Sequence, residues 1–199
     1  MKKIMIAIPA MDMMQSWTAR CLINLRHVGE VEAEWIIRMQ VDMARNVLAQ
    51  RAIERGFDRI LWIDSDMTFE PDLMERLDAD LDEGWDVVSG LYFKRTFPAE
   101  PVLYKAVDPT VPKSDTYWDY PRDSIFPAAG FGFGGVMMRV DAIADMEEPP
   151  FLPFDNMSED LSFCVRMAER GKRMACDSRV KLGHMGMIVF GEKMYKHPD

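Results

Sequence analysis

Two aspartates placed two positions apart carry the clearest chemical signal in this sequence. Asp64 and Asp66 lie in the stretch RILWIDSDMTFEPD, residues 59–72, directly after a short apolar run that fits a buried strand. Ligands of open α/β sheets bind at the carboxyl ends of strands, where two carboxylates repel each other until a divalent cation lies between them. Hard oxygen ligands favour Mg²⁺ or Mn²⁺, which usually share their coordination sphere with substrate phosphates. The pair therefore predicts a metal site, whereas an Asx turn before Pro71 would explain only one of the two aspartates.

A second acidic pair, Glu159 and Asp160, lies in SEDLSFCVRMAERGKRM, residues 158–174. A helix is expected over 158–170, with Ser158 as its N-cap and both acids in its first turn, where the helix dipole stabilises negative charge. A carboxylate can also accept a proton from an attacking hydroxyl group. The spacing alone is consistent with either explanation.

The glycine-rich stretch 130–135 satisfies the pattern G-x-G-x-x-G. A dinucleotide-binding motif of this form follows a strand and opens a helix. Here the apolar residues 136–139 predict a strand after the glycines, so a dinucleotide site is not expected.

The elements that must position these residues alternate along the chain, which predicts an α/β fold with a mostly parallel central sheet flanked by helices. Strands are expected over 3–9, 33–39, 59–63, 86–93, 135–140 and 173–177, and helices over 18–27, 42–55, 71–84 and 158–170. Residues 96–127 are rich in proline and aromatic residues and lack helical periodicity. This segment is expected to form loops and short strands that shape a pocket or a lid.

Composition limits the class of protein. The chain has 199 residues, 48% of them hydrophobic and 29% charged, which fits one packed domain over 1–199. With 33 acidic against 24 basic residues, the formal charge of −9 argues against broad nucleic-acid binding. No apolar run reaches the ~20 residues of a membrane helix. Three cysteines without metal-type spacing suggest reduced thiols and a cytoplasmic location.

Taken together, these motifs resemble those of the family-2-like nucleotide-sugar glycosyltransferases of the GT-A fold. The resemblance starts with a first strand that ends in Ile8–Pro9, continues with Arg45 on a helix before the Asp-x-Asp strand, and ends with the Glu-Asp helix and a later histidine, His184. It implies one sugar transfer from a nucleotide-diphosphate sugar to an acceptor hydroxyl, with residues 1–95 as the nucleotide-binding half and 96–199 as the acceptor-side half.

The resemblance also implies a role for each matching residue. Residues near the nucleotide would be Pro9, Arg45, Asp64 and Ser65, and ligands of Mn²⁺ or Mg²⁺ would be Asp64, Asp66 and His184. If the enzyme inverts configuration, the catalytic base would be Asp160 with Glu159 beside it; if it retains configuration, one of these two acids would contact the sugar instead. The acidic pair that usually follows the second strand is missing, so the base of the nucleotide stays open. The Gln-x-x-Arg-Trp motif of processive synthases is also missing, which favours single transfer to an acceptor that the sequence does not identify.

Two other functions remain open at this point. Ile60–Thr68 also fits the first motif of haloacid dehalogenase-like phosphatases, in which Asp64 would be the nucleophile and Asp66 a general acid–base. That motif normally lies on the first strand, whereas about 60 residues precede it here. The other possibility is a nucleotide-sugar-binding domain without turnover.

Overall fold

The structure, a computed structural model, describes residues 1–111, 114–186 and 189–194. Its α-helices are α1 (Ser16–Ile23), α2 (Val41–Glu54), α3 (Leu73–Asp82) and α4 (Glu159–Glu169), and its short 3₁₀ helices are η1 (Val140–Ala142) and η2 (Glu192–Met194). Its strands are β1 (Lys3–Ala10), β2 (Glu30–Ile37), β3 (Arg59–Ile63), β4 (Met67–Thr68), β5 (Val87–Leu91), β6 (Leu103–Ala106), β7 (Asp115–Thr116), β8 (Ile125–Pro127), β9 (Gly130–Phe131), β10 (Gly135–Arg139), β11 (Met174–Lys181), β12 (Gly183–Met185) and β13 (Val189–Phe190).

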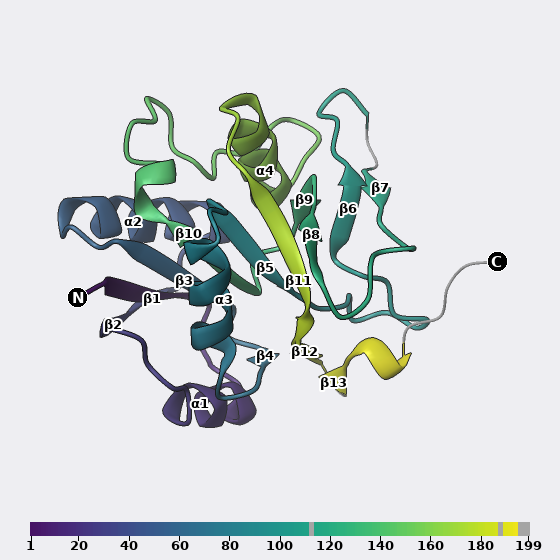
Figure 1. Ribbon diagram of the computed structural model, residues 1–199, viewed down its shortest axis with the longest axis horizontal. Helices are drawn as coiled ribbons and strands as arrows, with labels where there is room; N and C mark the ends of the chain where they lie inside the picture. Colours follow the sequence, from purple (N-terminus) through teal and green to yellow (C-terminus); the bar gives the residue numbers. More distant parts are fainter. Residues whose placement is uncertain (112–113, 187–188, 195–199) are drawn as a thin grey trace.

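A seven-stranded mixed sheet forms the centre, in the order β2-β1-β3-β10-β5-β11-β8 (Figure 1). β1 runs parallel to both β2 and β3, and β5 runs parallel to β11. β10 lies between β3 and β5 and is antiparallel to both, and β8 is antiparallel to β11 at one edge. This confirms the predicted α/β class with a largely parallel sheet, to which β10 and β8 add the antiparallel neighbours.

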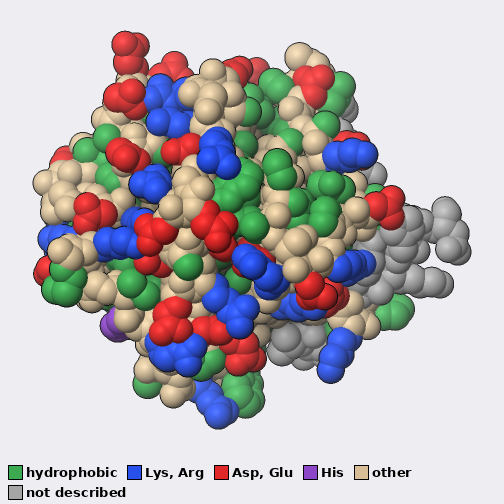
Figure 2. Space-filling model, viewed as in Figure 1, with side chains coloured by type: hydrophobic (Ala, Val, Ile, Leu, Met, Phe, Trp, Pro, Cys, Tyr) green, Lys and Arg blue, Asp and Glu red, His purple; other side chains and the backbone are tan. Residues whose placement is uncertain are grey.

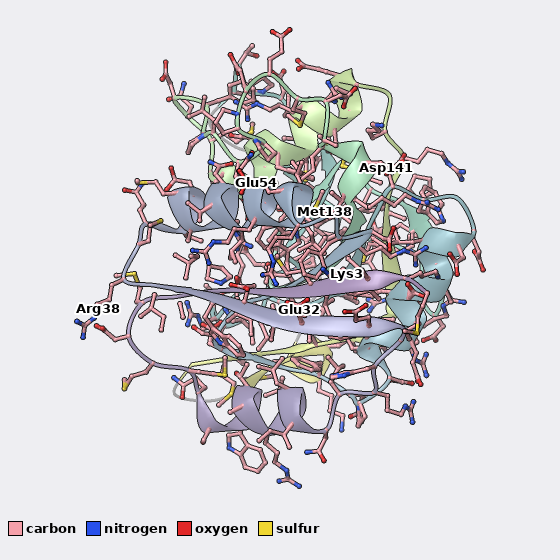
Figure 3. The ribbon with its side chains drawn as sticks, turned by 90° about the vertical axis from the view of Figure 1, so that its left-hand side faces the viewer. Lys3, Glu32, Arg38, Glu54, Met138 and Asp141 are labelled. Carbon is pink, nitrogen blue, oxygen red and sulfur yellow. The ribbon has the colours of Figure 1, made fainter. Side chains whose placement is uncertain are left out.

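Helices cover both faces of this sheet, because successive residues of a strand point to opposite sides. In β1, Met5 and Ala7 belong to the core beneath α2 and α4, whereas Ile4, Ile6 and Ile8 belong to the core that includes α3. Figure 3 shows the result: α2 lies on one side of β1 and β2, and α1 lies on the other. The two cores make the central strands rigid supports for the loops at their ends.

Most predicted elements form within a few residues of their expected bounds. β2 begins at Glu30, before the predicted start, because it is the edge strand, where Glu30, Glu32 and Glu34 can alternate with apolar residues. The described residues of the segment 96–127 form loops with the short strands β6, β7 and β8, as expected. The glycine-rich stretch runs from β9 into β10, which confirms the strand predicted after the glycines.

Acidic and basic side chains are interspersed over the surface seen in Figure 2. All three cysteines are free, and Cys164 and Cys176 are buried, as the expected reduced thiols would be. No helix in the described part of the chain combines the length and apolar character needed to cross a bilayer.

Candidate active site

Asp64 and Asp66 directly follow β3, at the edge of the sheet where β1, β3 and β5 all end. The Asp64 backbone N–H donates to the carbonyl of Gly134, just before β10 starts, at 3.5 Å. The Gln15 N–H, in the loop before α1, donates to the Ser65 carbonyl at 2.9 Å. The Asp64 side chain is 30% exposed and that of Asp66 22%. Both carboxylates are therefore held on fixed backbone while their side chains stay accessible.

Arg45 joins this aspartate pair to the second acidic pair. Its side chain, on α2, is only 3% exposed, and its Nη2 donates to Asp64 Oδ1 at 3.0 Å while its Nε donates to Glu159 Oε1 at 3.3 Å. Burial lowers the pKa of Arg45, but the charges of Asp64 and Glu159 outweigh it and the pKa is raised overall. The guanidinium is therefore permanently charged. Within the described residues its Nη1 is buried without a hydrogen-bond partner.

Aromatic rings surround the other sides of this guanidinium. Arg45 Cζ lies 5.2 Å from the ring centroid of Phe133 and 5.8 Å from that of Trp62, within the range of a cation–π interaction. Phe133 and Trp62 are themselves almost fully buried. Charges in such surroundings interact more strongly than they would in water.

Glu159 and Asp160 occupy the first turn of α4, as predicted. The predicted cap is wrong in one detail: the Ser158 side chain makes no hydrogen bond to the helix backbone, because its hydroxyl donates to Asp160 Oδ1 instead. The Leu161 N–H donates to the same carboxylate oxygen at 2.7 Å. Burial, then the charge of Asp160, raises the pKa of Glu159, and burial raises the pKa of Asp160. Raised pKa values make both carboxylates better proton acceptors.

Asp66 has two nitrogen-bearing neighbours of its own, Arg95 and His184. Arg95 Nη1 donates to Asp66 Oδ2 at 2.7 Å, and His184 Nε2 lies 3.5 Å from the same oxygen. His184 Nδ1 is 3.0 Å from the Phe93 carbonyl, and its strand β12 pairs with β4, just beyond Asp66. Burial raises the pKa of Asp66, but the hydrogen bond and charge of His184 and the charge of Arg95 outweigh it, so the pKa is lowered overall.

The predicted metal ligands come together only in part. In the described part of the chain no three His, Cys, Asp or Glu residues form a cluster suited to a metal ion: Asp66 and His184 are neighbours, but Asp64 pairs with Arg45. A carboxylate oxygen and an imidazole nitrogen nevertheless fit Mn²⁺, and Mg²⁺ also takes most of its ligands from phosphates and water. Two protein ligands are enough for a cation that shares its coordination sphere with a diphosphate.

Pro9 lies at the same edge, near the end of β1, opposite Ile36 of β2. The next residue, Ala10, accepts a hydrogen bond from the Arg38 N–H at 3.1 Å, so the carboxyl ends of β1 and β2 are tied together. In Figure 3, Arg38 follows the carboxyl end of β2, whereas Lys3 marks the start of the neighbouring strand β1. The structure thus places Pro9 at the same edge of the sheet as Asp64 and Ser65, which follow β3.

Two residues of the site were not predicted, Tyr92 and Arg95, both just after β5. The Gly134 N–H approaches the Tyr92 hydroxyl at 3.4 Å, and the Tyr92 ring meets that of His184 edge-on, with centroids 5.6 Å apart. Burial, then the charges of Asp64 and Asp160, raises the pKa of Tyr92 well above its usual value. The available signal was the end of the strand predicted over 86–93, because parallel strands end at one edge of the sheet.

No protein-family model and no curated protein sequence matches the chain. Among solved structures, the crystal structure of A197 from STIV superimposes with a TM-score of 0.72 at 20% identity, covering 94% of this chain and 86% of that one. The crystal structure of GalNAc-T7 with UDP, GalNAc and Mn²⁺ gives a TM-score of 0.62 at 10% identity. That match covers 100% of this chain but 45% of GalNAc-T7, so this chain spans less than half of it.

Both identities are so low that these similarities bear on the fold alone. They agree with the expectation drawn from the sequence. The chain has an α/β fold whose seven-stranded mixed sheet, flanked by helices, resembles the GT-A glycosyltransferase fold.

Proposed function

We propose that this protein is a metal-dependent glycosyltransferase that moves one sugar from a nucleotide-diphosphate sugar to an acceptor hydroxyl. The GT-A-like fold supports the class of enzyme. The observation that carries the proposal is the buried Arg45, which brings Asp64 and Glu159 together from two predicted motifs that lie far apart in the sequence.

The donor would bind along the edge formed by Pro9, Ser65 and the two aspartates, within residues 1–95. Asp66 and His184 would hold Mn²⁺ or Mg²⁺ on the diphosphate, and the cation would neutralise charge that develops on the leaving group. Asp64 would lie beside the same diphosphate. Arg45 fixes the Asp64 carboxylate at 3.0 Å, so this acid stays in place before the donor arrives.

The acceptor would enter from the side of α4, within residues 96–199. If transfer inverts the anomeric carbon, the oxygen of the acceptor hydroxyl attacks that carbon and the nucleoside diphosphate leaves. Asp160 accepts the proton of the hydroxyl during this attack. Glu159 is held by Arg45, which leaves Asp160 as the base and Glu159 as its neighbour. If transfer retains configuration, these acids contact the sugar and no base is needed.

The test is incubation of the protein with Mn²⁺ and a panel of nucleotide sugars, followed by measurement of the nucleoside diphosphate that is released. We expect slow release of the nucleoside diphosphate from one donor. This release should be lost in Asp66→Asn and retained in Asp72→Asn. Asp72 is a suitable control because its side chain is 25% exposed and lies in an ion pair with Arg76.

Other outcomes distinguish the alternatives. Formation of a phosphate-mimic complex on Asp64 would support the phosphatase instead. Binding of a donor without release, even with candidate acceptors present, would support a nucleotide-sugar-binding domain without turnover.

A further inference from the structure

Asp66 already has a positively charged partner at the position where a metal ion is expected. Arg95 Nη1 donates to Asp66 Oδ2 at 2.7 Å and also to the Met185 carbonyl at 3.2 Å. Oδ2 is also the oxygen that faces His184 Nε2. A cation held jointly by Asp66 and His184 would therefore need the space and the oxygen that Arg95 uses.

A guanidinium and a divalent cation cannot share this oxygen at low cost. Both are positive, so they repel each other at a separation of a few ångströms. The Arg95 side chain is 49% exposed, so it can leave Asp66 for solvent without unfolding anything. Exposed ion pairs of this kind are weak. Arg45 differs, because it is buried and held by two acids.

We propose that Arg95 is a built-in counter-ion of Asp66 that a divalent cation must displace in order to bind. The inference rests on the metal site of the proposed function and adds a residue that sets its affinity. Without a cation, Arg95 neutralises Asp66. When a cation binds, Arg95 moves into solvent or towards the anionic donor, and its carbonyl contact with Met185 is lost.

The test uses Mn²⁺ alone, with free Mn²⁺ measured by electron paramagnetic resonance during titration of the whole protein. Arg95→Gln removes the competing charge and should bind Mn²⁺ about three to ten times more tightly than the wild type. Arg95→Lys keeps the charge and should stay close to the wild type. Arg76→Gln is the matched control, because its side chain is 48% exposed and pairs with Asp72; it changes the net charge equally and should leave affinity unchanged.

The double variant Asp66→Asn with Arg95→Gln should lose the increased Mn²⁺ affinity of Arg95→Gln. That loss would show that the increase depends on Asp66. Equal or weaker binding by Arg95→Gln overturns the inference. If Arg95→Gln binds no more tightly than the wild type but Asp66→Asn abolishes binding, the metal site stands and only the role of Arg95 falls. If no variant binds Mn²⁺ at millimolar concentration, both fall. Thermal unfolding of every variant checks that the fold is intact.

Discussion

Arg45 Nε donates to Glu159 Oε1 at 3.3 Å although 114 residues separate them in the chain. One residue lies on α2 in the first half of the chain and the other opens α4 in the second half. Because the same guanidinium also binds Asp64, one buried charge contacts acids from both halves of the chain. Arg45 therefore positions both acids, a role beyond the nucleotide contact that its sequence context suggested.

Replacement of Arg45 should destabilise the protein strongly. Arg45→Leu leaves Asp64 and Glu159 facing each other without a counter-ion. Loss of one partner of a fully buried pair costs about 3–5 kcal/mol, which is an upper limit here because the Asp64 side chain is 30% exposed. Arg45→Lys keeps the charge but cannot bind both acids in the same geometry, so an intermediate loss is expected. Urea unfolding measures the change. Arg51→Leu, on the same helix with a 42% exposed side chain, should have little effect, and equal losses for Arg45→Leu and Arg51→Leu would contradict the assignment.

Gly132 should not tolerate a side chain. A Cβ there would collide with the Tyr92 hydroxyl and approach Val102 Cγ1 at 2.8 Å. Gly132→Ala should therefore lower the free energy of unfolding by about 1–3 kcal/mol, as overpacking does, and should reduce turnover by displacing Tyr92 from His184. At Gly191, by contrast, no atom of the described residues lies within 4 Å of the position that a Cβ would take, so Gly191→Ala should be close to neutral. If Gly132→Ala left the free energy of unfolding and turnover unchanged, Tyr92 would be free to move.

Asp80, on α3, should make stability depend on pH. Burial, then the charge of Asp177 on β11, raises the pKa of Asp80 to about 7, and Arg179 Nη2 lies 3.1 Å from its Oδ1. In the unfolded chain Asp80 loses its proton near pH 4. The folded state therefore binds more protons between pH 4 and 7, so the Asp80 contribution to stability falls as pH rises through this window.

Asp80→Asn should remove this contribution and stabilise the protein at pH 8 relative to the wild type. The difference in unfolding free energy between variant and wild type should grow with pH, by at most about 1.4 kcal/mol per pH unit. Glu75→Gln, on the same helix with a 42% exposed side chain, is the control. A pH-independent difference for Asp80→Asn would contradict the raised pKa.

Asp160 should set the acid limit of transfer. Because burial raises its pKa, its base form is lost at a pH above the ordinary aspartate range, and kcat/KM should fall as the solution is acidified through that pH. Asp160→Asn should lose about 10²–10⁴-fold in rate and show no such acid limb. Asp155→Asn, an exposed acid upstream of the same helix, should behave as the wild type. An Asp160→Asn enzyme of normal rate would favour a retaining mechanism or a base other than Asp160.

Local sequence patterns were enough to predict the α/β class, most helices and the Asp-x-Asp strand. They were enough because β3 is a continuous apolar run and α3 repeats leucine every four residues. These patterns could not predict that β10 lies between β3 and β5. A mainly apolar strand fits any buried position in a sheet, so its sequence does not reveal its neighbours. The contact between Asp66 and Arg95 has no local signature either, because it depends on β3 and β5 ending at the same edge of the sheet with β10 between them.

The proposed function requires that a nucleoside diphosphate binds this edge of the sheet through a cation on Asp66. Isothermal titration with a panel of nucleoside diphosphates, in Mn²⁺ and then in EDTA, measures this binding. We expect one diphosphate to bind the wild type and Asp72→Asn in Mn²⁺, and to bind at least about tenfold more weakly in EDTA or to Asp66→Asn. Equal affinity with and without Mn²⁺, or an unchanged affinity in Asp66→Asn, would contradict the proposed function.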